Sequence, residues 1–432
     1  MRVPVKGLFV TINDRLRQII KSPSFSSVAI FASGSFFVAV LGGVGGLIQA
    51  RWLEPEVFGE FRKYGILTMY LSLGYSVVHD GLIRQYPYLL GKGDQKAALH
   101  VAGIAKWWYS FVTILYVFLF AILSVIALFK ADYRGAIGWG AQIPGSIALV
   151  YGAYLGVMYR SSINFKRLSY NNIISSVLSV FGLIFVKIWG YWGLAVRFIL
   201  MQLTSVWINQ HYLPVKAKAL FDFKALSNLA KISLRFSIPG YLHSSALIAS
   251  MNTLILCYCG EAGLGVYALA VMVKGMGMTF SNALNQIFHV KISTKYGETE
   301  DVYECLRYTK IPTLLAIALS LVLVVGLCVS IGPFIRMVLP KYIDSIPVIQ
   351  ILSIAIFLQA ASLPLIVINS ALWYKTFAVK CAGNFCVTII AVILLPKTPC
   401  MVAIASILGI IAEMGIGYFS IAWNYRFIKI AH

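Results

Sequence analysis

The chain has 432 residues, of which 59% are hydrophobic and only 12% are charged, and its mean hydropathy is +0.82. Soluble domains average roughly 45–50% apolar and about 25% charged residues, so this composition excludes a soluble enzyme, a disordered tail protein and a disulfide scaffold. The formal net charge of +21 would suggest a nucleic-acid partner in a soluble protein. Here the basic residues cluster in short loops between apolar segments, which indicates membrane orientation and no nucleic acid.

Apolar segments long enough to cross a bilayer recur along the whole chain. A spanning helix needs about 17–25 predominantly apolar residues. By this measure we expect twelve transmembrane helices, near residues 26–50, 64–83, 107–129, 136–158, 172–187, 191–208, 236–259, 264–290, 312–335, 346–372, 377–395 and 400–423. The sequence therefore predicts an all-α integral membrane protein.

The loops between these segments alternate in charge. Short cytoplasmic loops carry more Lys and Arg than external loops do. The loops on the side of the two chain ends hold most of the 36 Lys and Arg residues. We therefore expect both termini to be cytoplasmic.

Two stretches outside the spans have the pattern of amphipathic helices. Within residues 1–25, apolar and basic residues fall on opposite helical faces, which predicts a cytoplasmic interfacial helix. A second pattern of this kind, from Phe221 to Arg235, predicts a cytoplasmic surface helix at the middle of the chain. The expected organisation is an N-terminal six-helix lobe at 26–208, an interlobe linker at 209–235 and a C-terminal six-helix lobe at 236–432.

The two halves share a weak internal similarity. WLEPEVFGEF at 52–61 precedes the second predicted span, and EAGLGVY at 261–267 precedes the eighth, which aligns Gly59 with Gly265. An even number of spans in each half predicts parallel repeats related by an axis along the membrane normal. Twin bundles of this kind are typical of transporters.

Ionisable side chains inside spans cost roughly 2.5–3.5 kcal/mol each, so each calls for a partner or a water-filled cavity. Lys274, deep in the eighth span, is the first candidate for a substrate-binding cation, with a structural ion pair as the alternative. Glu413, in the middle of the twelfth span, is a candidate for carrying a proton. It could equally neutralise Lys274 or Arg197, which would be a purely structural role.

The remaining polar candidates are weaker. Arg197 in the sixth span could grip phosphate oxygens bidentately or simply brace two helices. Asp80 and Arg84 stand four residues apart, so a local ion pair is their first interpretation, and Lys380 lies near enough to the start of its span to snorkel to the interface. The expected substrate-binding residues are thus Lys274, Arg197, Arg84, Lys380 and Asn282, and those expected to serve ion coupling or gating are Glu413, Asp80 and Asn252.

Motifs for common enzyme chemistry are absent from the sequence. The seven cysteines lie mostly inside spans and form no pair of CxxC motifs, so neither a zinc site nor a disulfide framework follows. No GxxxxGK[ST], HExxH or GxSxG motif occurs, and the external loops are short. We expect no metal, no cofactor and no enzymatic activity.

Several segments resemble a known family, in order and in their placement on spans. They are ARWLEPEVFGEF (50–61), YPYLLGKGD (86–94), SIPGYL (237–242), GVYALA (265–270) and PKYIDSIPVIQIL (340–352). Together they resemble the polysaccharide repeat-unit flippases, the O-antigen and capsule exporters of the multidrug/oligosaccharidyl-lipid/polysaccharide exporter superfamily. The likeness covers essentially the whole chain.

The resemblance implies two six-helix lobes in a V, with a basic central cavity lined by the first two helices of each lobe. It implies flipping of an undecaprenyl-diphosphate-linked oligosaccharide from the cytoplasmic to the outer leaflet of a bacterial inner membrane, for assembly of surface polysaccharide. The partners it implies are that lipid-linked oligosaccharide, membrane lipids, a polysaccharide polymerase and chain-length proteins. Family members carry an Asp in the middle of the seventh span, where this chain has Asn252; Glu413 is the candidate to replace it.

Two rival functions remain at this point. A multidrug or cation exporter of the same superfamily would be expected to place acids, rather than Lys and Arg, in its cavity. A membrane polysaccharide polymerase would be expected to show a sizeable external loop. The excess of Lys and Arg inside the spans and the short external loops favour the flippase.

Overall fold

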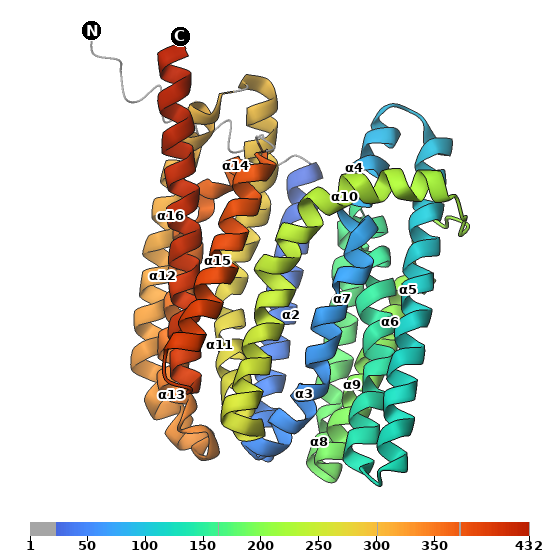
Figure 1. The fold of residues 1–432 in the computed structure, drawn as a ribbon, viewed down its shortest axis with the longest axis vertical. Helices are drawn as coiled ribbons and strands as arrows, with labels where there is room; N and C mark the ends of the chain where they lie inside the picture. Colours follow the sequence, from blue (N-terminus) through green and yellow to red (C-terminus); the bar gives the residue numbers. More distant parts are fainter. Residues whose placement is uncertain (1–22, 163, 300, 371–372, 432) are drawn as a thin grey trace.

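The computed structural model describes residues 23–431 except 163, 300 and 371–372, and Figure 1 shows that the described chain is built from long helices. The side chains of a few further residues within helices are also outside the description. The first half contains α2 (Pro23–Trp52), α3 (Pro55–Leu71), α4 (Leu73–Gly91), α5 (Gln95–Phe129), α6 (Tyr133–Ser161), α7 (Phe165–Phe181), α8 (Leu183–Trp189) and α9 (Tyr191–His211).

The second half begins with α10 (Phe223–Tyr241), which runs through the π-helical turn η1 (Leu242–Ala246) into α11 (Leu247–Thr299). It continues through α12 (Val302–Val338), η2 (Pro340–Tyr342), α13 (Ser345–Ala361), η3 (Leu363–Leu365), α14 (Ile366–Ser370), α15 (Tyr374–Leu394) and α16 (Pro399–Ala431). No strand occurs among the described residues. The predicted all-α fold is therefore confirmed, while the interfacial helix predicted within residues 1–25 lies largely outside the described part of the chain.

The number of spans is consistent with the twelve predicted. Within the described residues, nine helices are long and apolar enough to cross a membrane, or ten when α3 and α4, bent by 52° at their junction, count as one span. The stretch Phe223–Thr279 is counted as one helix. Gly260 within it has a non-helical backbone (φ 67°, ψ −166°) and divides the stretch into two helices. The predicted seventh and eighth spans lie on either side of Gly260, and the shorter apolar helix α13 covers most of the tenth.

Local chemistry explains where several helices begin and end. Asp94, Asp132 and Asp222 precede α5, α6 and α10, and each side chain accepts a hydrogen bond from the backbone N–H three residues later. Such caps satisfy donors that the first helical turn leaves unpaired. Gly190 and Gly260 have positive φ, a conformation that glycine adopts without steric cost, and the chain reverses at both.

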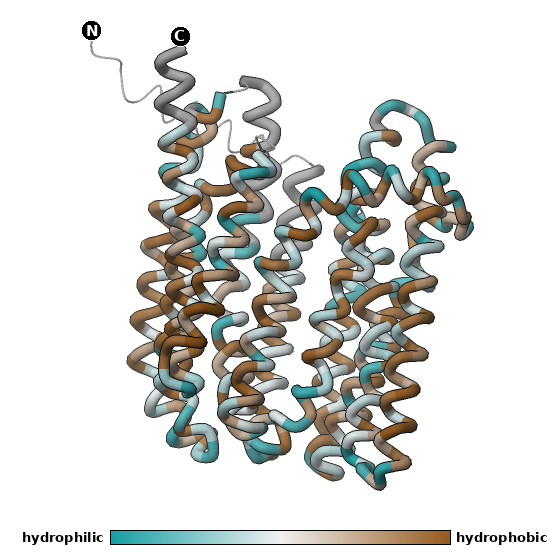
Figure 2. Tube along the Cα trace, viewed as in Figure 1, coloured by the Kyte–Doolittle hydropathy of each residue, from teal (hydrophilic) through white to brown (hydrophobic). Residues whose placement is uncertain are grey.

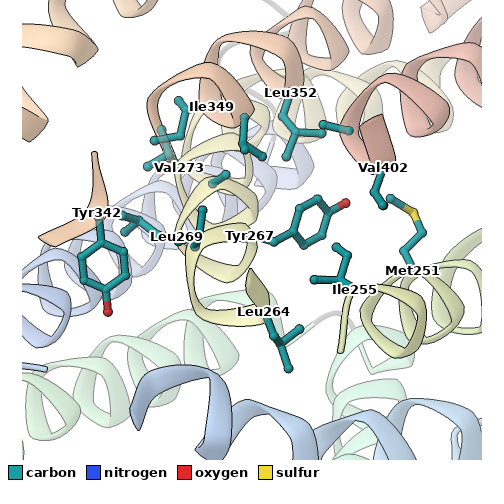
Figure 3. Close-up of a cluster of buried hydrophobic side chains, with 14 of the residues drawn as sticks. Met251, Ile255, Leu264, Tyr267, Leu269, Val273, Tyr342, Ile349, Leu352 and Val402 are labelled. Carbon is teal, nitrogen blue, oxygen red and sulfur yellow. The ribbon is translucent and has the colours of Figure 1, made fainter. Parts of the chain in front are cut away.

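Each half has its own apolar core. Tyr109, Phe120 and Tyr154 are fully buried in the first half. In the second half, Tyr267 packs with Met251, Ile255, Leu352 and Val402, from α11, α13 and α16, in the cluster drawn in Figure 3.

The outward faces of the helices are also apolar, as Figure 2 shows along α5 and α12. Phe118 on α5 is 64% exposed and Val322 on α12 is 73% exposed. Apolar surface of this extent suits a lipid environment rather than water.

The halves meet where α3 crosses α11, toward the end of the molecule remote from the C-terminus (Figure 1). A Cβ on Gly59 would overlap the carbonyl oxygen of Glu261, and a Cβ on Gly265 would overlap that of Pro55. Each glycine thus meets the carbonyl four residues before the other. The contact is reciprocal, as expected if the two aligned segments are internal repeats.

Two ion pairs lie beside this crossing and also join the halves. Lys63 Nζ lies 2.5 Å from Glu261 Oε1, and Lys341 Nζ lies 2.5 Å from Glu54 Oε1. The Tyr342 hydroxyl lies 3.5 Å from the carbonyl oxygen of Leu53. The two halves are therefore fastened together at this end of the molecule.

Candidate functional site

The predicted polar residues fall into separate groups rather than one pocket. Glu413 and Lys380 lie together in the second half, whereas Asp80 and Arg84 both meet α10. Arg197 lies among α2, α7 and α9, and Lys274 stands apart on α11. The contacts of each group decide what chemistry it can support.

Lys274 is a cation on α11 that lies beside the apolar core of the second half. It is partly buried on α11, on the same helical face as Ala270 and Tyr267, four and seven residues earlier, which are buried in the second-half core. Within the described part of the chain, its ammonium makes no ion pair and no hydrogen bond. The alternative of a structural pair with Glu413 is therefore wrong, because Glu413 is bound elsewhere.

Arg197 is held by uncharged partners. Its Nε donates to the carbonyl oxygen of Ser179 at 2.9 Å, its Nη2 donates to Ser179 Oγ at 3.1 Å, and its Nη1 donates to Gln49 Oε1. Gly45 and Gly182 leave room for the side chain. These bonds tie α9 to α2 and α7, as in the bracing role considered for Arg197, yet no described carboxylate neutralises its charge.

Arg62 is a further interior cation that sequence reasoning placed in an external loop. The second span was expected to begin at residue 64, but α3 begins at Pro55 and carries Arg62 along its length. The Arg62 side chain is exposed, and its guanidinium lies over the Phe58 ring at 5.1 Å from the centroid. It lies close enough to Arg197 to feel its charge.

Glu413 is the centre of a buried polar cluster in the second half. Its Oε1 lies 3.2 Å from Lys380 Nζ, and its Oε2 lies 3.1 Å from His243 Nδ1 and accepts from Asn384 Nδ2 at 2.8 Å. Thr388 Oγ1 donates to Asn384 Oδ1 at 3.2 Å. Helices α15 and α16 and the turn η1 thus converge on one carboxylate.

This cluster corrects the expectation for Lys380. Its side chain is only 10% exposed, so it does not snorkel to the interface. Because a buried charge needs a partner, its stem turns inward to Glu413. The sequence signal that could have shown this is helical phase, since Lys380 shares a face of α15 with the buried residues Asn384 and Thr388.

Asp80 and Arg84 do not form the local ion pair that their spacing suggests. Ser237 Oγ on α10 donates to Asp80 Oδ2 at 2.6 Å, and the Arg84 guanidinium lies over the Phe236 ring at 3.6 Å from its centroid. Ser233 Oγ donates to the carbonyl oxygen of Ser76 on α4 at 2.9 Å, and Ser237 Oγ lies 2.7 Å from the same oxygen. Tertiary packing of α10 against α4 has replaced the pairing within α4.

The two predicted amides lie on different parts of α11. Asn252 lies at the crossing with α3, where its Nδ2 is 3.8 Å from Met69 Sδ. Asn282 is exposed near the other end of the helix, and its side chain makes no polar contact within the described residues. The structure does not bring them together.

The balance of charge in the interior is positive. Lys380 and Glu413 neutralise one another. Lys274, Arg62 and Arg197 have no carboxylate partner within the described residues. Those residues also contain no group of three or more His, Cys, Asp or Glu side chains arranged to hold a metal ion. Three cations without a described carboxylate partner would attract an anionic group.

Comparison with known proteins adds two findings. Residues 48–347 match the family model described as polysaccharide biosynthesis protein. No curated protein matches the chain.

Solved transporter structures share the fold. An inward-facing multidrug resistance MATE family transporter of the MOP superfamily aligns with a TM-score of 0.64 at 14% identity, over 93% of this chain and 98% of its own. An outward-facing MATE family transporter aligns with a TM-score of 0.65 at 14% identity, over 96% of this chain and 99% of its own. A MOP superfamily transporter from Pyrococcus furiosus aligns with a TM-score of 0.61 at 14% identity, over 95% of this chain and 97% of its own. It is described as having a binding pocket of reverse polarity. At this identity the likeness establishes the fold alone.

Proposed function

Because this chain belongs to the family of polysaccharide biosynthesis proteins, we propose that it is a flippase for a polyprenyl-diphosphate-linked oligosaccharide. The family and the transporter fold support a multi-pass membrane exporter rather than an enzyme. The proposed substrate is an undecaprenyl-diphosphate-linked repeat unit, carried from the cytoplasmic to the outer leaflet of a bacterial inner membrane. In this orientation both termini are cytoplasmic.

The observation that carries the proposal is the unneutralised positive charge in the interior. A diphosphate leaves water only where cations replace its hydration. Lys274 and Arg62 are the groups free to supply such contacts, and Arg197 contributes its field while holding α2, α7 and α9 together. The sugar can bond to amides and hydroxyls of the interior while the polyprenyl tail stays in lipid.

A multidrug exporter is the second candidate, because the solved structures of the fold include multidrug transporters. A cationic drug would require unpaired acids in the interior. Glu413 is instead neutralised by Lys380, and Asp80, whose hydrogen-bond partner Ser237 is uncharged, is outnumbered by the three cations that have no carboxylate partner among the described residues. The sign of the interior therefore favours an anionic substrate.

The proposal is tested in cells whose own copy has been removed. Wild-type protein is expected to restore surface polysaccharide, whereas Lys274→Ala leaves lipid-linked repeat units in the inner leaflet and little polysaccharide outside. Lys130→Ala, at an exposed position after α5, is the matched control and should restore both to wild-type levels. Wild-type surface polysaccharide with Lys274→Ala would remove Lys274 from the site, and unchanged polysaccharide in cells lacking the chain would contradict the function.

A further inference from the structure

One continuous segment holds a carboxylate from each half of the molecule. On α10, Ser237 donates to Asp80 of α4 in the first half at 2.6 Å. Six residues later on η1, His243 Nδ1 lies 3.1 Å from Glu413 Oε2 of α16 in the second half. The segment from α10 to η1 thus connects the two carboxylates, and neither contact was expected from the sequence.

The histidine end of this segment is able to take up a proton. An ionised carboxylate only accepts hydrogen bonds, so Nδ1 facing Glu413 carries a hydrogen and Nε2 is the position for the next proton. The His243 side chain is 43% exposed, so the protein does not enclose it completely. It lies on a π-helical turn, a rare geometry that is frequent at functional sites.

The groups around His243 favour a proton over a metal cation. Lys380 on α15 already occupies Glu413 Oε1 at 3.2 Å, so a sodium ion on this carboxylate would meet the ammonium group. Other titratable groups on the elements packed against η1 include the Cys381 thiol on α15 and Tyr241 on α10, whose hydroxyl donates to the carbonyl oxygen of Tyr70 on α3 at 3.0 Å. Since Lys380 and Glu413 cancel, protonation of His243 sets the net charge of the cluster.

We propose that His243 is a proton-binding site whose charge state controls the attachment of the α10–η1 segment to α15 and α16. The imidazolium form adds charge attraction to the hydrogen bond with Glu413 and tightens the attachment. The neutral form weakens it, and the segment then follows α4 through Asp80 and Ser76. The idea that this attachment couples a proton gradient to transport rests on the proposed function. Proton binding at His243 is independent of that function.

The site is tested first without substrate, on the full chain in nanodiscs. Spin labels at Lys92→Cys and Lys375→Cys, exposed positions in the two halves, report the distance between them in a background whose native cysteines are replaced by alanine. Between about pH 8 and pH 5.5, the range in which histidine titrates, the distance distribution is expected to shift. His243→Gln and Glu413→Gln should each abolish the shift.

His211→Gln is the matched control, because His211 stacks on Trp207 and contacts no described carboxylate. It should keep the shift. An unchanged shift in His243→Gln, or no shift in the wild-type protein, would overturn the proposal. If His243→Gln does not fold, Glu413→Gln provides the second variant, because it removes the carboxylate that His243 contacts.

A second measurement tests the coupling in proteoliposomes that contain an undecaprenyl-diphosphate-linked oligosaccharide. An imposed pH gradient is expected to accelerate wild-type flipping by about fivefold or more, within the usual range of coupling energies. His243→Gln should flip at the gradient-free rate of the wild type and gain nothing from the gradient. Acceleration of His243→Gln by the gradient would contradict the coupling, whereas no flipping by any protein would contradict the proposed function and leave the distance result to decide the site.

Discussion

Two interior cations of the same charge have different surroundings, which separates their roles at the scale of single residues. Arg197 makes three hydrogen bonds to Gln49 and Ser179, so it stabilises the fold. Lys274 makes none within the described residues, so burying its charge lowers the stability of the fold. A partly buried cation that the described residues neither pair nor hydrogen-bond is a good candidate for contacting a ligand.

This difference predicts opposite effects on stability. Arg197→Met should lower the free energy of unfolding by about 2 kcal/mol, the usual contribution of hydrogen bonds to a charged group. Lys274→Met should leave it unchanged or raise it. Reversible unfolding in mixed detergent measures both, and a loss with Lys274→Met as large as that with Arg197→Met would show that Lys274 is structural.

The Lys380–Glu413 pair predicts strong coupling between two substitutions. Removing either partner leaves the other charge buried, at 10% and 12% side-chain exposure, so Lys380→Met and Glu413→Gln should each destabilise the protein. The double variant should be less destabilised than the sum of the two, by about 0.5–3 kcal/mol. A double-mutant cycle measures this energy, and additive losses would mean that the contact contributes nothing.

At the scale of helices, the sequence predicted the positions of most spans but not their bends or the partners of their polar groups. Hydropathy placed the start of the second span at residue 64, because Glu56, Glu60, Arg62 and Lys63 interrupt the apolar pattern. The helix nevertheless begins at Pro55, since a helix at the crossing between halves can be polar on one face. Arg62 was missed for this reason.

The partners of Lys380 and Asp80 were unpredictable for a different physical reason. Both lie on helices whose neighbours come from distant parts of the sequence, Glu413 and Ser237 respectively. Local spacing predicts contacts along one helix, but it contains no information on which face meets which neighbour. The internal repeat stays a prediction, and the reciprocal contact of Gly59 and Gly265 is consistent with it.

The helix crossing at Gly59 and Gly265 predicts a steric effect confined to one position on α3. Gly59→Leu should force α3 away from α11, because its side chain would overlap the backbone of Glu261. Gly65→Leu on the same helix is the control, since no atom lies within 4 Å of its Cβ position. A cysteine at Ser250, which faces Tyr70 across the crossing, should react faster with an impermeant thiol reagent in Gly59→Leu alone. Equal reactivity in both variants would contradict a tight crossing.

At the scale of the whole molecule, the halves meet both where α10 lies against α4 and where α3 crosses α11, and the ion pairs lie beside the second of these contacts. The glycine crossing and the pairs Lys63–Glu261 and Lys341–Glu54 all lie toward the end remote from the C-terminus. The proposed transport requires these contacts to separate, so that the substrate head can leave on that side.

Locking this end should therefore arrest transport. A disulfide between Glu54→Cys and Lys341→Cys would hold the halves as they are in this structure, and flipping in proteoliposomes should stop on oxidation and resume on reduction. The single variants should transport at similar rates under both conditions, because an exposed ion pair contributes little energy. Undiminished flipping in the oxidised double variant would show that this end does not open.

The central claim is that unneutralised cations in the membrane interior let a diphosphate head cross. The most direct measurement is the initial flip rate, in proteoliposomes, of an undecaprenyl-linked oligosaccharide with a diphosphate linkage and of one whose linkage is uncharged. We predict rapid flipping of the diphosphate lipid, a decrease of about tenfold or more with Lys274→Met, corresponding to about 1.4 kcal/mol, and little flipping of the uncharged lipid by either protein. Equal rates for the two lipids, unchanged by Lys274→Met, would contradict the claim.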